Sequence, residues 1–338
     1  MSDVEKRVGV FVGAFVLALV VGSVALGAVG GGSAPAVDDS NASAFNTGDA
    51  VAEVPEESGE ISMSEDAEGK VVVIDTTYSS SVTPETVTPM ANTLTENGAT
   101  VRYSSGGSGF GLNSTLSDAD AYILIGASAP ISDADAAGLQ AFTDAGGRVV
   151  LMNEPQQQAP ASPFGGPSRS FGPPKPLLPL TSQYGLSYDN GYLYNVADND
   201  NNYRTIYGTP AGNSALTDGV DRVVLHESVG VNGGQPVVTA SEGTTQSTTR
   251  QSDTYTVLTR SDNLVAVGDS SIVDEEWVYR ADNEALVGNL LDFLVAGEKS
   301  PEDAPDGGGF GGGGFGSGSD GGFGGDEPTP STATPIAP

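Results

Sequence analysis

The stretch from Ala121 to Met152, AYILIGASAPISDADAAGLQAFTDAGGRVVLM, decides the fold. Its two apolar runs, AYILI and RVVLM, lack the polar alternation of a half-exposed strand, as is typical of strands covered on both faces. Between them, Ser132 and Asp135 predict the capped start of a helix, and Gly146-Gly147 predicts its end. Strand, helix and strand in this order predict a parallel βαβ unit.

The same alternation continues on both sides of this unit. A helix that starts at Thr83-Pro84 or Thr88-Pro89 and stops at Gly98 separates two of the further strands. We therefore expect an α/β domain over residues 70–297, with an open, mostly parallel sheet and helices on both faces. The further elements are the predicted strands KVVVID (70–75), TVRYS (100–104) and LVAVGDSS (264–271) and the closing helix DNEALVGNLLDFLVAG (282–297).

The region between these elements is less regular. Residues 153–179 are rich in Pro, Gln, Gly and Ser and predict a long loop over the carboxyl end of the sheet. YGLSYDNGYLYNV (184–196) predicts a hairpin that turns at Asp189 to Gly191. RVVLHESVGV (222–231) and PVVTAS (236–241) predict further strands.

The charge and the cysteine content exclude several classes of function. The chain has 44 acidic and 13 basic residues and a net charge of -31, so it lacks the basic surface that nucleic acid requires. It contains no cysteine, which excludes disulfides, thiolate metal sites and cysteine nucleophiles. An acidic surface of this kind is typical of a salt-adapted protein, because concentrated salt screens the repulsion between carboxylates.

The N-terminus predicts a membrane anchor. Residues 1–7 end in Lys6 and Arg7, and the uncharged run from Val8 to Val29 is long enough to span a lipid bilayer as a transmembrane helix. The positive flank predicts a cytoplasmic N-terminus and a single-pass protein of the cell membrane whose main domain is extracellular. A cleaved signal peptide with its cleavage site near Ser33 to Ala36 is the alternative.

Two segments flank the predicted domain without any periodic pattern. Residues 30–69 are acidic and rich in Ser and Ala, which predicts a flexible stalk. Residues 298–338 are rich first in Gly and Phe and then in Pro and Thr, which predicts a disordered tail. Asn41 and Asn113 begin sequons and are candidate glycosylation sites in an extracellular protein.

The order of these motifs resembles a known family. VVVID, the stretch from Leu116 to Pro155, NSALTDGVDRVV and LVAVGDSSIVDEEWVYRADNEALVGNLLDFL resemble membrane-anchored amidotransferase-like domains of unknown function, of haloarchaeal type. The segment is more distantly similar to extracytoplasmic subunits of gliding-type ABC export systems. The resemblance implies a flavodoxin-like sheet of the class I glutamine amidotransferase type, with partners in the membrane or the envelope.

The resemblance also implies where chemistry would lie. Active members of that wider fold place a nucleophilic cysteine on a sharp turn after a central strand. The matching position here falls near Met152, Asn153 and Glu154, where no cysteine stands. We therefore expect no amidotransferase activity.

Open α/β sheets bind ligands at the carboxyl ends of their strands. The side chains expected at that edge are candidates for ligand binding: Asp75, Ser128, Asn153, Glu154 and Asp269. Glu154 can act as a general base if it is buried, whereas a solvated loop carboxylate is the alternative. Asp269 is either a ligand-facing acid or the cap of a local turn.

Other motifs indicate no site. The sequence contains no G-x-S-x-G motif, which would supply the serine of a catalytic triad. The only histidine, His226, is therefore predicted to have a structural role. The oxygen-rich run Asp198–Asn202 lacks the pattern of an EF-hand, and the loop Gly106–Gly111 lacks a Walker lysine. We expect no metal and no cofactor.

Three functions remain open from the sequence. The first is a non-catalytic binding or assembly module, accessory to an ABC-type transport or envelope system. The second is a divergent hydrolase that uses Glu154 or Asp269, and the third is a structural component of the envelope.

Overall fold

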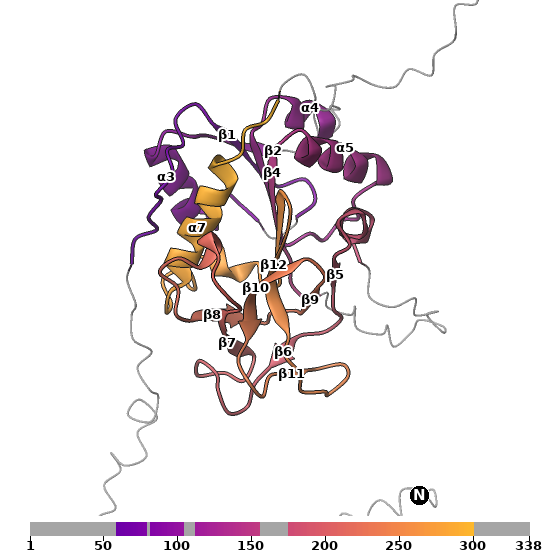
Figure 1. Cartoon of the computed structure of the whole chain (residues 1–338), viewed down its shortest axis with the longest axis vertical. Helices are drawn as coiled ribbons and strands as arrows, with labels where there is room; N and C mark the ends of the chain where they lie inside the picture. Colours follow the sequence, from indigo (N-terminus) through magenta and orange to yellow (C-terminus); the bar gives the residue numbers. More distant parts are fainter. Residues whose placement is uncertain (1–58, 80–81, 105–111, 156–174, 301–338) are drawn as a thin grey trace, which may run out of the picture. The chain divides into compact units, whose positions relative to one another are not determined.

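The computed structural model describes residues 59–79, 82–104, 112–155 and 175–300 (Figure 1). Its main feature is a nine-stranded sheet with the strand order β2-β1-β3-β4-β13-β12-β10-β7-β8. The first five of these strands are parallel, and the remaining pairings are antiparallel. The strands are β1 (Val71–Asp75), β2 (Thr100–Ser104), β3 (Ala121–Ile125), β4 (Arg148–Met152), β7 (Thr205–Pro210), β8 (Val223–His226), β10 (Gln235–Ala240), β12 (Thr256–Ser261) and β13 (Leu264–Val267).

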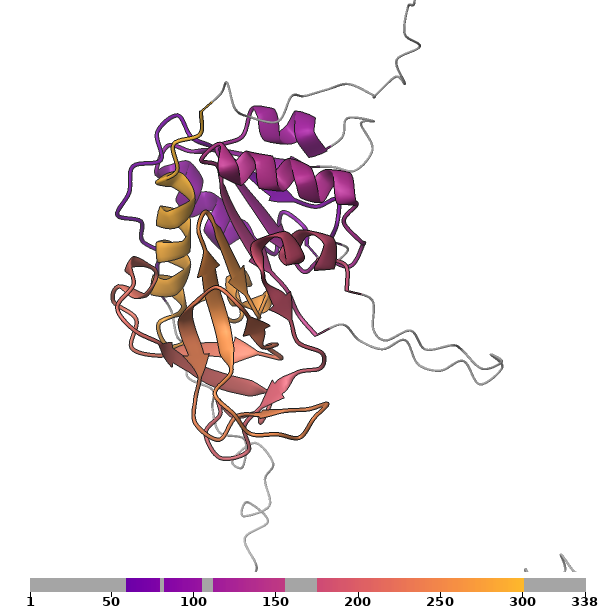
Figure 2. The ribbon, with the colours of Figure 1, turned by 45° about the vertical axis from the view of Figure 1, so that its right-hand side comes forward.

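Helices cover both faces of the parallel part, as predicted (Figure 2). Alternate residues of β3 belong to opposite sides of the sheet: Ile123 packs in the cluster with helices α3 and α7, and Tyr122 in the cluster with α4, α5 and α6. Every residue of β3 is buried, which explains why its sequence is apolar without alternation. The helices are α3 (Thr88–Glu96), α4 (Leu112–Ser117), α5 (Asp133–Asp144), α6 (Leu178–Thr181) and α7 (Asn283–Val295), with 3-10 turns η2 (Ser182–Tyr184), η3 (Ala215–Thr217) and η4 (Ser271–Val273).

The structure confirms an α/β domain with parallel strands from β1 to β4, and it adds one helix. The sequence predicted β2 and β3 without a helix between them, whereas α4 lies there and packs on α5. The two helices touch closely, because a side chain at Gly138 of α5 would collide with Asn113 Oδ1 of α4. Asn113, a candidate glycosylation site, therefore has its side-chain oxygen buried between helices.

The predicted hairpin at 184–196 is wrong. Strand β5 (Ser187–Tyr188) pairs with β9 (Val231–Asn232), whereas β6 (Leu193–Tyr194) pairs with β11 (Thr245–Gln246). The two strands do not pair with each other because both lie along residues 226–232, to which Asp189 N and Leu193 N donate hydrogen bonds. The predicted strand 222–231 is also interrupted, since Glu227 takes a left-handed conformation with φ of 50°.

The folded domain begins before the predicted boundary at Lys70. Ile61 and Ala67, expected in the stalk, are buried. The carboxylate of Asp292 on α7 accepts hydrogen bonds from Ser64 N at 2.9 Å, Ser64 Oγ at 2.7 Å and Glu65 N at 2.9 Å. Residues 59–69 therefore pack on α7 as part of the domain.

The expectation of a transmembrane protein finds no support in the structure. Within the described ranges, no helix has the length and apolar character needed to cross a membrane. The predicted span from Val8 to Val29 lies outside the described residues, as do Asn41, the tail from residue 301 and the glycine loop.

Side chains at the start of α7 form hydrogen bonds with the outer edge of β8, the last strand of the nine-stranded sheet. Asn283 is fully buried, and its Oδ1 accepts a hydrogen bond from Val224 N while its Nδ2 donates to Val224 O, both at 2.9 Å. The neighbouring Asp282 Oδ2 accepts from Asp221 N and Arg222 N. The amide of Asn283 thus pairs with the outer edge of β8 as a peptide group would.

Replacing Asn283 by leucine tests this pairing. The change keeps the branched shape of the side chain but leaves buried backbone groups of β8 without partners, so we expect the free energy of unfolding to fall by about 3 kcal/mol. The control is Asn289→Leu on the same helix, which loses side-chain bonds nearer to solvent and should cost about 1 kcal/mol. Urea unfolding measures both, and equal losses would contradict the role of Asn283 in pairing with β8.

Candidate functional site

The carboxyl ends of the parallel strands gather all five candidate residues at one edge of the sheet, in two groups. Asp75 is the last residue of β1, and Ser128 follows β3. Asn153, Glu154 and Asp269 follow β4 and β13, which are neighbours in the sheet. The edge predicted from sequence therefore exists, and its two halves differ in what the side chains do.

Asp75 holds the backbone that follows β1. It is fully buried, and its Oδ1 accepts hydrogen bonds from Thr77 N at 2.9 Å and Tyr78 N at 2.8 Å. Ser104 Oγ donates to its other oxygen at 2.6 Å. Ser128 N donates to Tyr78 O, so this group ties the turn after β1 to its neighbours. Both oxygens of Asp75 are used in these ties.

Asp269 is likewise a tie between segments. Its Oδ2 accepts a hydrogen bond from His226 N at 2.6 Å, and its Oδ1 accepts from the N and Oγ of Ser271 at 2.7 Å. Burial raises the pKa of Asp269 to about 7, and the charge of Glu154 raises it too, against the lowering effect of these hydrogen bonds. This geometry is that of a cap that joins the end of β8 to the turn after β13.

Glu154 is the carboxylate nearest to solvent in this group. Ser270 Oγ donates to its Oε1 at 2.6 Å. Burial raises the pKa of Asp274 to about 6, with added contributions from the charges of Glu154 and Glu276. These carboxylates thus affect one another electrostatically, but the described residues hold no group of three ligands suited to a metal ion.

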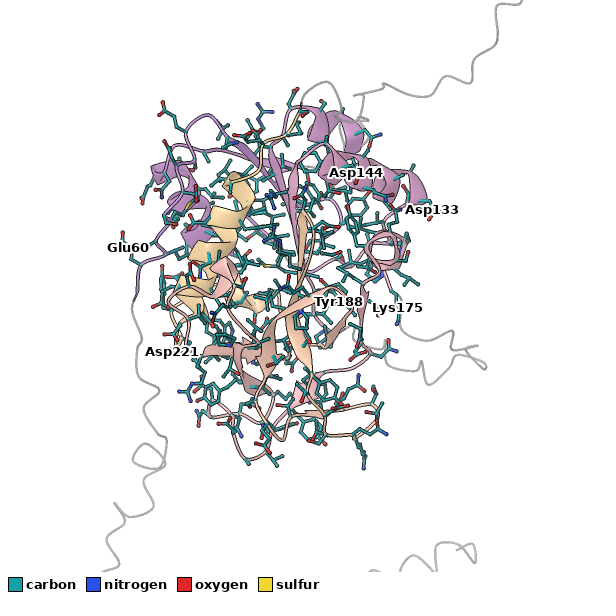
Figure 3. All side chains as sticks on the ribbon, in the orientation of Figure 1. Glu60, Asp133, Asp144, Lys175, Tyr188 and Asp221 are labelled. Atoms are coloured by element: carbon teal, nitrogen blue, oxygen red, sulfur yellow. The ribbon has the colours of Figure 1, made fainter. Side chains whose placement is uncertain are left out.

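A small pocket opens beside Asn153 and Glu154. Lys175 and Tyr188 line it together and are neighbours in Figure 3. Tyr188 is held against the sheet, since its hydroxyl donates to Leu151 O at 3.1 Å. The other lining residues are Pro176, Leu177, Leu178, Thr181, Ser187, Asp189, Asn190 and Gly191.

Asn153 has a buried group without a partner in this pocket. Only 5% of Asn153 is exposed, and its Oδ1 accepts no hydrogen bond from any described residue. A buried carbonyl in this state costs about 1–3 kcal/mol unless a donor reaches it. Leu178 nearby is 46% exposed and adds apolar surface to the pocket. The pocket can therefore take a group that combines an N–H or O–H donor with apolar atoms.

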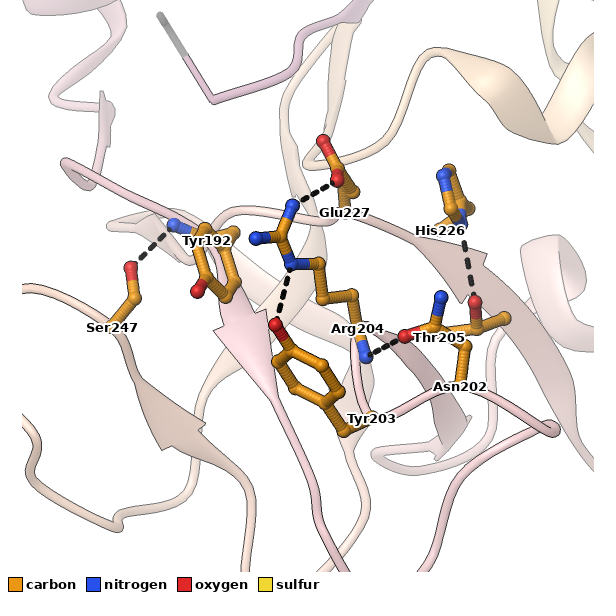
Figure 4. Close-up of polar contacts among 8 residues, drawn as sticks. All are labelled: Tyr192, Asn202, Tyr203, Arg204, Thr205, His226, Glu227 and Ser247. Carbon is orange, nitrogen blue, oxygen red and sulfur yellow. Dashed lines mark hydrogen bonds and ion pairs between the residues drawn. The ribbon is translucent and has the colours of Figure 1, made fainter. Parts of the chain in front are cut away.

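His226 does not act with Asp269 as a catalytic pair. Its ring stacks on Trp277 with the centroids 4.4 Å apart, and its Nδ1 lies 3.1 Å from Thr205 Oγ1. Only its backbone N contacts Asp269. Figure 4 shows the ring of His226, the last residue of β8, directed to Thr205 of β7. This agrees with the predicted structural role.

A patch of tyrosines lies next to this strand (Figure 4). Arg204 stacks on Tyr192, with Cζ 4.4 Å from the ring centroid, and donates to Glu227 Oε1 at 2.6 Å. Tyr203 packs edge-on against Tyr194 and is 45% exposed. The patch holds the loops of the antiparallel half together.

The run Asp198–Asn202 also holds loops of the antiparallel half together. Its Asp200 forms an ion pair with Arg280 at 2.8 Å, and the amide of Asn199 donates to Asn195 O. Its polar side chains therefore stabilise a turn.

The sequence located the edge of the sheet but missed most of the pocket. Residues 175–191 were predicted as loop and hairpin, and nothing in their order indicates that they return to β4. The signal that could have found Lys175 and Leu178 was the Leu-Pro-Leu run of α6, which is too apolar for a solvated loop.

The raised pKa of Asp269 predicts a pH dependence of stability. The carboxyl of Asp269 has a pKa of about 7 in the folded state and near 3.8 in the unfolded state, so the folded state holds its proton more tightly. The protonated carboxyl therefore stabilises the fold at low pH, and this stabilisation is lost as the pH rises from about 4 through 7. Relative to Asp269→Asn, the free energy of unfolding of the native protein should fall by about 2–3 kcal/mol between pH 5 and pH 8.

Urea unfolding in 1 M potassium chloride measures this difference, because the Debye length there is about 3 Å and general charge repulsion is screened. The matched control is Asp262→Asn, at an exposed position with φ of 51° that asparagine tolerates. Its pH profile should follow that of the native protein. Parallel profiles for Asp269→Asn and the native protein would show that Asp269 is not the titrating group.

Comparisons with known proteins show a fold and no family. No family model matches the chain, and no curated protein matches it. Six chains of solved structures match it. One of them, "mmIFT52 N-terminal domain", is similar with a TM-score of 0.51 at 10% identity, and the match covers 68% of this chain and 99% of that chain. At this identity the likeness shows that the two chains share a fold.

Proposed function

We propose that this chain is a non-catalytic binding module whose site is the pocket beside Asn153 and Glu154. The observation that carries the proposal is the buried Oδ1 of Asn153, an acceptor to which no described residue donates, on a residue that lines the pocket. A bound group with an N–H would supply the missing hydrogen bond and remove the cost of leaving this oxygen unpaired.

The architecture supports this choice of site. The strand order β2-β1-β3-β4-β13 has the pattern of a flavodoxin-like sheet, and we propose that finer fold for the parallel part. Such sheets bind their ligands outside the carboxyl ends of the strands, where Asn153 stands. The absence of cysteine from the sequence also supports a binding role for a site of amidotransferase type.

The lining favours a segment of a protein as the bound partner. Pro176, Leu177 and Leu178 offer apolar contacts, and Asn153 offers a single directed acceptor. A peptide has this combination, with apolar side chains beside a backbone N–H. The resemblance noted in the sequence adds a context, an accessory role in an ABC-type transport or envelope system.

A crosslinking pull-down in high salt from cells that make the protein tests this proposal. Asn153→Leu removes the acceptor and keeps the branched shape of the side chain, and Leu178→Ser removes apolar surface from the pocket. We expect a partner that the native protein captures to be absent with both variants. Val196→Ser is the matched control, since Val196 is 77% exposed and does not line the pocket, and it should capture the same partner.

Two outcomes would contradict the binding module. Capture of the same proteins by all variants would show that the pocket is not the site. Hydrolysis of an ester or glycoside by the native protein, lost in Glu154→Gln, would favour the alternative of a divergent hydrolase, because Glu154 lines the pocket and follows the carboxyl end of β4.

A further inference from the structure

A second and larger hollow lies at the amino end of β4. It encloses about 540 Å³, and the length of the strand separates it from Asn153. Its walls come from the start of β4, the end of β12, helix α7 and the segment before β1. The lining residues that matter for the argument are Arg148, Arg260, Phe293, Glu65, Asp218 and Asp292.

Two arginines of this hollow share one aromatic ring. The Cζ of Arg148 lies 4.8 Å from the centroid of Phe293, and that of Arg260 lies 5.2 Å from it. Burial lowers the pKa of Arg148, and the charge of Arg260 lowers it further. Stacking on Phe293 offsets only part of the cost of bringing two like charges together.

Neither guanidinium has an anionic partner among the described residues. The ion pairs found there join Arg204 to Glu227 and Arg280 to Asp200. Nε and Nη1 of Arg148 are buried and find no hydrogen-bond partner among the described residues. Arg260 donates from Nε to Asp262 O at 2.9 Å, which leaves its two terminal nitrogens free of the described protein groups.

The missing partner is not explained by a shortage of carboxylates. Acidic residues outnumber basic ones by 44 to 13 in the chain, and three carboxylates line the same hollow. Asp292 is turned away to Ser64 and Glu65, whose groups donate to it. No carboxylate among the described residues forms an ion pair with either guanidinium, so both groups remain available to an external anion.

We infer that this hollow binds a small ligand through a carboxylate or phosphate group held by Arg148 and Arg260. The oxygens of such a group accept hydrogen bonds from the guanidinium nitrogens of Arg148 and the terminal nitrogens of Arg260. The ring of Phe293 lies within cation–π range of both guanidinium groups and so supports them on one side of the hollow. This site is independent of the pocket at Asn153.

Isothermal titration calorimetry on the full chain tests the inference, with inorganic phosphate in one arm and succinate in the other. At least one of these anions should bind to the native protein, and the better binder tells whether the site prefers a tetrahedral or a planar oxyanion. Arg148→Gln and Arg260→Gln should each weaken that binding about tenfold or more, the usual effect of losing a charged hydrogen bond.

The matched control is Arg222→Gln. Arg222 also stacks on an aromatic ring, with Cζ 4.0 Å from the centroid of Tyr207, but it lies outside the hollow. Its removal should leave the affinity unchanged. Arg260→Gln carries the test if Arg148→Gln proves unfolded by circular dichroism, because Arg260 is held by a single hydrogen bond to a turn. The inference is overturned if neither anion binds, or if the variants at Arg148 and Arg260 bind as tightly as the native protein.

Discussion

Burial of the central parallel strands on both faces is the constraint on which the rest of the structure depends. β3 and β4 are covered by α3 and α7 on one side and by α4, α5 and α6 on the other. Their backbone groups can find partners only within the sheet, so these strands must align in register. This alignment brings the carboxyl ends of the parallel strands to one edge of the sheet. There Asn153 lies beside residues of the segment 175–191, and Asp269 binds the backbone of His226.

The sequence predicted this central part because its signals are local. Apolar runs without alternation, the capping serine at Ser132 and the closing glycines at Gly146-Gly147 each act within a few residues, and the structure contains the helix and strands they predict. The side chain of Ser132 accepts from Asp135 N, as the motif implies. The ends of these elements then identified the edge that holds the candidate residues.

The remainder depends on contacts between distant parts of the chain, for which no local signal exists. Asp-Asn-Gly at Asp189–Gly191 is a strong turn signal, yet β5 and β6 pair with strands far along the sequence. Arg148 begins a buried strand and reads as an ordinary boundary residue, and only the fold places Arg260 and Phe293 beside it. Likewise, only the fold brings residues of the segment 175–191 beside Asn153, to whose Oδ1 no described residue donates.

The two ends of the nine-stranded sheet differ in a way that affects self-association. At one end Asn283 occupies the outward-facing N–H and C=O of Val224 in β8. At the other end, β2 pairs only with β1 among the described strands, and it is largely exposed. A sheet with one covered edge strand can pair with a second copy only through its other edge strand, which here is β2. The resulting pair has no free edge strand for a third copy. Among the described strands, β2 thus offers the exposed edge, and pairing of two copies through that edge would leave no second exposed edge from which a fibre could grow.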